Sequence, residues 1–239
     1  MLLLINIQPE IRQHPYIPFW ILIPILIAIT LTSVLYIYSP KLILLPFLSL
    51  IDHRVRRELM EARKSFQYRL LFLLDFVFYI SFSFLMYYIF QKSNVLQFLS
   101  LPFFEITQYQ EIYHYILVLI AVIITLIFKR QIFLSIANLF DETHRYSIFI
   151  FNLDMLLKFF GMVLLPVIFL YSFRIIDSIQ ILYFVFAVNL IIYFLSLIIS
   201  FNSVSQKGII DYINFILYLC ALEIIPLLFF LKFLFSTDD

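Results

Sequence analysis

The feature that most constrains this chain is a series of long apolar segments separated by short polar stretches. Six of them stand out, at residues 18–38, 70–90, 113–128, 148–173, 181–201 and 213–235. A helix rises about 1.5 Å per residue, so about 20 apolar residues cross a hydrocarbon core that is about 30 Å thick. Because lipid offers the backbone no hydrogen-bond partners, such segments are expected to be helical. The sequence therefore predicts an all-α polytopic membrane protein, a bundle of six transmembrane helices forming one domain over residues 1–239.

The composition agrees with this class. Hydrophobic residues make up 64% of the 239 residues and charged residues 13%, and the mean hydropathy is +1.04. Soluble domains contain roughly 45–50% apolar and about 25% charged residues. A net charge of +1 also argues against recruitment of nucleic acid. The lone cysteine of this chain, Cys220, excludes an internal disulfide and a thiolate metal cluster.

Lysine and arginine gather after the first, third and fifth apolar segments, most densely in "HRVRRELMEARKSFQYR" at residues 53–69. Such an excess marks the cytoplasmic side of a membrane protein. The pattern predicts that both termini lie outside the cytoplasm. The first stretch, "MLLLINIQPEIRQHPY", lacks a basic start, and no small-residue cleavage site follows the first segment, so we expect residues 18–38 to remain as the first helix.

Several stretches between the segments are too apolar or too amphipathic for ordinary loops. Residues 42–51 are about half a span long and are expected to lie at the membrane interface, followed by a charged helix over 53–69. Residues 133–145 are expected to form another amphipathic piece, and residues 95–104 to lie flat on the outer leaflet. Each stretch could instead be a docking surface for another protein.

Four ionisable side chains fall inside the apolar segments: Asp75, Asp154, Lys158 and Glu223. Each costs about 2.5–3.5 kcal/mol at the centre of a membrane helix, so they are expected to face the bundle interior. By the helical rise, Lys158 and Glu223 lie ~15 Å from the cytoplasmic ends of their helices, and the two aspartates roughly 8–9 Å. Because Asp154 precedes Lys158 by one turn, we hypothesise a buried Asp154–Lys158–Glu223 triad in which one acid is protonated.

The role of these charges stays open on the sequence alone. They could form a polar staple that fixes which helices pair, or a proton or substrate pathway. Asp75 could instead reach the membrane surface. Whether Lys158 pairs with Asp154, with Glu223 or with both is also open.

Other residues place polar groups or breaks within the same helices. Asn152 and Asn189 carry amides that need partners on neighbouring helices. Pro166 and Pro226 each leave a carbonyl four residues earlier without its helical partner, and with Gly161 they are expected to mark kinks. We therefore assign one buried polar cluster, which comprises Asp75, Asn152, Asp154, Lys158, Asn189 and Glu223.

Sequence signatures of catalysis are missing. The chain has no H-E-x-x-H, G-x-S-x-G or P-loop pattern, and its four histidines are scattered along the sequence. We expect no enzyme activity, no cofactor and no metal site.

Three stretches resemble an uncharacterised family of multi-spanning bacterial proteins of the Bacteroidetes lineage, a domain of unknown function. They are "ELMEARKSFQYRLLFLLDFVFYISFSFLMYY", "SIFIFNLDMLLKFFGMVLLPVIFL" and "FILYLCALEIIPLLFFLKFL". The closing L-Y-L-C-x-L-E-x-x-P pattern is its most specific part. The likeness covers most of the chain from Arg54 onward, and its landmarks are Asn152, Lys158, Gly161, Pro166, Tyr218, Leu219, Cys220, Glu223 and Pro226. The resemblance implies a bacterial inner membrane with both termini periplasmic, and it implies no activity.

We expect the chain to act as a non-enzymatic inner-membrane component or assembly factor of a bacterial envelope complex. Its partner would be a membrane or periplasmic protein, and it could form an oligomer. The alternative is a small proton-coupled transporter or channel-like subunit that uses the Asp, Lys and Glu of the polar cluster. Only 2 glycines and the lack of a repeat argue against transport.

Overall fold

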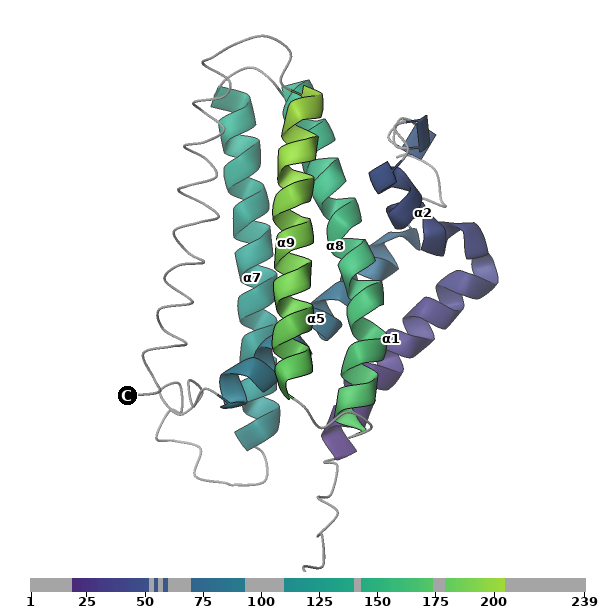
Figure 1. Cartoon of the computed structure of the whole chain (residues 1–239), viewed down its shortest axis with the longest axis vertical. Coiled ribbons are helices and arrows are strands. Elements are labelled where there is room, and N and C mark those ends of the chain that lie inside the picture. The colour runs from purple at the N-terminus through teal and green to yellow at the C-terminus, as the bar shows by residue number, and fades with distance from the viewer. Residues whose placement is uncertain are drawn as a thin grey trace, which may run out of the picture.

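The computed structural model describes residues 19–51, 54–55, 58–59, 70–92, 110–139, 143–173 and 179–204. Its elements over these residues are helices (Figure 1): α1 (Phe19–Tyr38), α2 (Pro40–Ile51), α5 (Phe72–Lys92), α7 (Gln110–Leu139), α8 (Thr143–Ser172) and α9 (Ile179–Val204). All of these except α2 are long and apolar enough to cross a membrane. The chain is therefore an all-helical multi-pass membrane protein with five such helices in its described part. The sixth predicted segment, 213–235, lies outside the described residues.

Helix α7 is much longer than the predicted segment 113–128. Lys129 and Arg130, which the sequence prediction placed in a loop, are part of the helix. The amphipathic piece predicted over 133–145 was also wrong, because α7 continues to Leu139 and α8 begins at Thr143. Two adjacent charged residues interrupt an apolar stretch of sequence. They do not terminate a helix when neither glycine nor proline follows them.

The helices alternate in direction, as short connections between membrane spans require. Helices α5 and α8 run parallel, because three pairs of contacting residues advance together: Asp75 with Lys158, Phe78 with Gly161, and Tyr88 with Ser172. Helix α7 runs antiparallel to α8, since Phe133 near its end packs on Phe149 near the start of α8. Figure 1 shows α7, α9 and α8 side by side, with α1 inclined beyond α8.

Helix α5 lies at the centre of the described bundle. It packs against α1, α7 and α8, and 56% of its span is buried, compared with 11% for the spans of α7 and α9. Its interior face carries large side chains such as Phe84, Leu85 and Tyr87. The outer helices therefore present most of their surface to the surroundings, whereas α5 and α8 form the core.

Helix α2 is too short to span a membrane and packs against α1 and α8. Leu42 is buried within it, and the Phe47 ring lies 5.6 Å from that of Phe159 on α8. The predicted half-span over 42–51 is thus a helix that lies against the bundle. The charged stretch 53–69 and the outer stretch 95–104 fall largely or wholly outside the described residues.

Candidate functional site

An ion pair joins the two central helices. The Nζ atom of Lys158 on α8 lies 2.6 Å from Oδ1 of Asp75 on α5, and the two side chains are only 6% and 23% exposed. The sequence had proposed Asp154 and Glu223 as the partners of Lys158; the structure adds Asp75, and the triad stays a prediction. The prediction compared Cα heights only, and a lysine stem is long enough to cover the helical turn, about 5.4 Å, that separates the two levels. Glu223 lies outside the described residues.

Two further charges act on this pair. Asp154 and Arg130 both interact electrostatically with the Asp75 carboxylate, and so does Lys158. Asp154 is partly buried on α8, one turn before Lys158, and Arg130 is exposed on α7. Two acids and two bases therefore balance each other, which lowers the cost of holding charge in an apolar bundle. We call Asp75, Arg130, Asp154 and Lys158 the charge cluster.

Close packing of the helices holds the ion pair in place. One turn beyond it, Gly161 of α8 faces Phe78 of α5, and a Cβ atom added at Gly161 would lie 2.6 Å from the Phe78 Cα atom. Only glycine allows this approach, and small residues serve the same purpose between other membrane helices. The kinks predicted at Gly161 and Pro166 remain predictions, and both residues lie within the single helix α8.

The two predicted asparagines behave differently. Asn152 is buried, and its Nδ2 atom has no hydrogen-bond partner among the described residues. Asn189 instead donates from Nδ2 to the carbonyl of Val185, 2.7 Å away on the same helix. A partner of Asn189 on another helix stays a prediction. Polar side chains within helices often bond the carbonyl one turn back, which makes a contact across the bundle unnecessary.

Polar side chains also follow one side of α5 beyond the charge cluster. Asp75, Tyr79, Ser83 and Tyr87 are spaced by four residues and so lie on one slowly turning stripe. The Ser83 Oγ atom is buried without a partner among the described residues. At the far end, Tyr87 interacts electrostatically with Glu111 of α7. The spacing was visible in the sequence, but serines and tyrosines are too common in this chain to single it out.

A second lysine contact joins α7 to α9. Lys129 donates a hydrogen bond to the hydroxyl of Tyr193, and its Nζ atom lies 4.8 Å from the centre of the Tyr193 ring. Hydrogen bonding combined with a cation–π contact stabilises an ammonium group where water is scarce. This contact could not be predicted while Lys129 was assigned to a loop.

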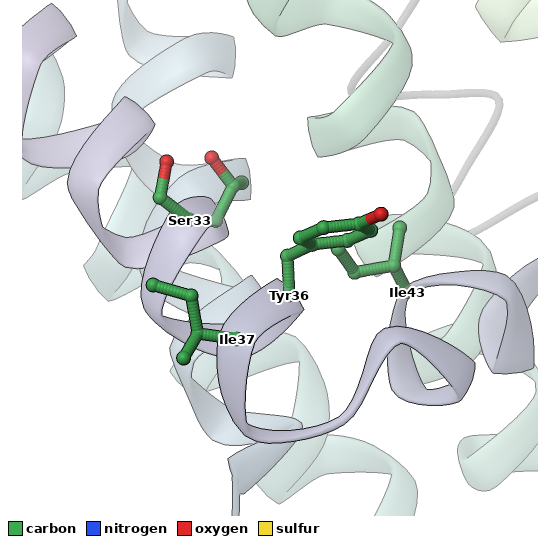
Figure 2. A pocket seen from close by; sticks show the side chains of 5 residues that line it. Ser33, Tyr36, Ile37 and Ile43 are labelled. Carbon is green, nitrogen blue, oxygen red and sulfur yellow. The ribbon is translucent and has the colours of Figure 1, made fainter.

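An open hollow of about 430 Å³ lies at the bend between α1 and α2. Its lining comprises Thr32, Ser33, Tyr36, Ile37 and Ile43, and Figure 2 shows the Tyr36 ring lying next to Ile43. The Thr32 hydroxyl donates to the carbonyls of Ala28 and Ile29. The hollow thus combines apolar walls with hydroxyl groups, and its lining includes no residue of the charge cluster.

Among the described residues, no three His, Cys, Asp or Glu side chains form a group that could hold a metal ion. Comparison with known proteins finds no match among curated proteins or among solved structures. A family described as "Domain of unknown function (DUF4271)" matches residues 15–234. That range contains all the described helices, the charge cluster and the hollow. The chain therefore belongs to the DUF4271 family, as a multi-pass membrane protein with a charge cluster between its central helices.

Proposed function

We propose that this protein is a non-enzymatic component or assembly factor of a membrane protein complex in the bacterial inner membrane, with both termini periplasmic. The observation that carries the proposal is the outward face of α1. Leu26, Thr30, Ser33 and Ile37 are spaced by three and four residues and are all exposed. They form one stripe along the helix, which we call the α1 face.

The α1 face has the composition of a helix–helix interface in a membrane. Leu26 and Ile37 are 57% and 78% exposed, and the small hydroxyl residues Thr30 and Ser33 lie between them. Small residues let two membrane helices approach closely, and their hydroxyl groups can bond across the interface. A face meant only for lipid needs neither property, and the exposed faces of α7 and α9 are richer in Ile, Leu and Phe.

The hollow at the bend continues this surface. Ser33 and Ile37 belong both to the α1 face and to the hollow in Figure 2. A transmembrane helix of a partner protein could lie along α1 and place a side chain near its end in the hollow. We infer that the partner is such a helix, with small or polar residues facing Thr30 and Ser33.

The charge cluster supports a structural role. Lys158 is paired with Asp75 within it, and the close approach at Gly161 fixes α5 against α8 beside this pair. A buried pair of this kind sets which helices associate and in which register. In this account the cluster keeps the core rigid, so that α1 and α2 present a constant surface.

Site-specific photo-crosslinking in native membranes tests the proposal. A photoreactive amino acid at Thr30 or Ser33 is expected to yield adducts with one and the same protein. The matched control is Ile120 on α7, which is 51% exposed and faces the surroundings. Lipid adducts alone at Thr30, Ser33 and Ile120 would refute the proposed partner surface.

A small proton-coupled transporter is the second candidate. The specific observation in its favour is the α5 stripe, which carries polar groups from Asp75 to Tyr87. It includes the buried Ser83 hydroxyl, which has no partner among the described residues. Buried polar groups without protein partners are often bridged by water, and water chains carry protons. Purified protein in liposomes would then conduct protons, and both Asp75→Asn and Ser83→Ala would reduce the flux. Flux equal to that of empty liposomes rejects this candidate.

A further inference from the structure

The hollow at the bend between α1 and α2 lies where the α1 span ends. The span runs from Trp20 to Tyr38, and α2 is too short to cross the membrane. The two most exposed large hydrophobic side chains of the described residues, Ile37 at 78% and Tyr38 at 71%, lie at this bend. Tryptophan and tyrosine are enriched at the level where membrane spans meet the lipid headgroups. The hollow therefore lies at a depth that favours an aromatic side chain with a polar tip.

The lining of the hollow favours a large and neutral occupant. The Tyr36 ring and the side chains of Ile37 and Ile43 supply its apolar walls (Figure 2), and no charged residue lines it. Pockets for small molecules measure roughly 300–1,000 Å³. A hollow of about 430 Å³ thus has room for one large side chain of a partner helix.

The Thr32 hydroxyl determines which polar tip fits beside it. Its proton is already donated to the carbonyls of Ala28 and Ile29, which lie 3.1 and 2.8 Å from its oxygen. The lone pairs of that oxygen can still accept a hydrogen bond. The indole N–H of tryptophan and the O–H of tyrosine can donate one. Phenylalanine and a lipid acyl chain have no such donor.

We propose that the partner helix anchors itself by a tryptophan or tyrosine side chain in the hollow. Its ring packs on Tyr36, and its N–H or O–H donates to the Thr32 hydroxyl. This inference rests on the proposed function, because the anchor belongs to the helix that lies along the α1 face. Aromatic side chains seated in pockets carry much of the binding energy of an interface. The anchor therefore holds the end of the partner helix, while Thr30 and Ser33 allow its close approach.

Two neighbouring tyrosines provide a matched pair of variants. Tyr36→Ala removes a ring that lines the hollow, whereas Tyr38→Ala removes a ring that does not. The two side chains are 63% and 71% exposed, so neither change is expected to unfold the protein. The photoreactive amino acid at Thr30, in full-length protein in native membranes, reports partner binding. Tyr36→Ala is expected to lower the yield of the partner adduct about tenfold, as loss of a binding hot spot does, and Tyr38→Ala to change it little.

A photoreactive amino acid at Ile43 identifies the side chain in the hollow. Ile43 lines the hollow from α2 and is not part of the α1 face. Mass spectrometry of linked peptides is expected to find the same partner that Thr30 captures, joined at a tryptophan or tyrosine or within one helical turn of it. Replacement of that aromatic residue by alanine in the partner is expected to abolish the Ile43 adduct.

The outcomes separate the anchor from the partner surface. No loss of the Thr30 adduct in Tyr36→Ala, or an equal loss in Tyr38→Ala, would overturn the anchor. An Ile43 adduct with lipid alone, or with a partner segment that lacks tryptophan and tyrosine, would also overturn it. In these cases the protein adduct at Thr30 in the otherwise unchanged chain would still support the proposed function. Lipid adducts alone at both Thr30 and Ser33 would instead refute the proposed function and the anchor together.

Discussion

The Lys158 side chain shows how single residues organise this bundle. The side chain is 6% exposed, and its ammonium nitrogen lies 2.6 Å from a carboxylate oxygen on another helix. An unpaired charge in such a place is strongly unfavourable, whereas a balanced pair costs much less. The same rule applies to hydroxyl groups, because a buried donor without a partner loses the hydrogen bonds it had with water.

Ser83 gives a prediction at this scale. Its Oγ atom is buried on α5 and has no partner among the described residues. Ser83→Ala removes this unsatisfied group, so the melting temperature in detergent is expected to stay the same or to rise. The matched control is Ser172→Ala, which removes a hydroxyl that lies 3.0 Å from the Tyr88 hydroxyl. This variant is expected to lower the melting temperature by the equivalent of about 1 kcal/mol. A marked loss of stability in Ser83→Ala would show that a bound water uses the group.

The sequence identified the charged residues but did not single out Asp75 as a partner of Lys158. Asp75 was recognised as an intramembrane acid, and only its pairing with α8 was missed. Pairing depends on which helices pack together and in which register, and the close approach at Gly161 sets that register. A single sequence with two glycines could not show that this one faces the backbone of Phe78.

Among the helices, α5 and α8 form the tightest association that the described residues show. They run parallel, and their contacts extend from the ion pair to the hydrogen bond between Tyr88 and Ser172. The existence of the five long helices followed from hydropathy alone. The end of α7 did not, because Lys129 and Arg130 were expected to lie in a loop, whereas both lie within α7 and Lys129 contacts Tyr193 of α9.

Gly161→Ala tests the close approach of the two helices. In an isolated helix alanine is more favourable than glycine by about 1 kcal/mol. At this position, however, the Cβ atom of alanine would meet the Phe78 backbone. The α5 helix must move away, so we expect a net destabilisation of about 1–3 kcal/mol in thermal unfolding. The matched control is Val163→Ala, at an exposed position of α8 that is expected to change stability little. An unchanged or higher melting temperature for Gly161→Ala contradicts the packing described.

The whole molecule has a buried core of α5 and α8 and outer helices with exposed faces. One of these faces, on α1, has a proposed occupant, which is a helix of a partner protein. Because the described helices alternate in direction, α1, α7 and α9 run one way through the bundle, and α5 and α8 run the opposite way. Our proposal that both termini are periplasmic requires an even number of spans.

A fusion to the C-terminus tests this topology. Alkaline phosphatase, which is active only outside the cytoplasm, is expected to be active when fused after Asp239 of the full chain. A second fusion, placed after Val204 at the end of α9, is expected to be inactive and serves as the control. Activity in the second fusion and none in the first would show that the membrane orientation is reversed.

The most direct test of the account is a double-mutant cycle on the pair that joins the central helices. Purified protein in mild detergent is melted as wild type, Lys158→Met, Asp75→Leu and the double variant. Lys158→Met is expected to cost about 3–5 kcal/mol, because it leaves the Asp75 carboxylate without its partner, and the double variant is expected to recover most of that loss. A parallel cycle with Asp154→Asn should show weaker coupling to Lys158. Additive losses for Asp75 and Lys158, or stronger coupling to Asp154, would contradict the account.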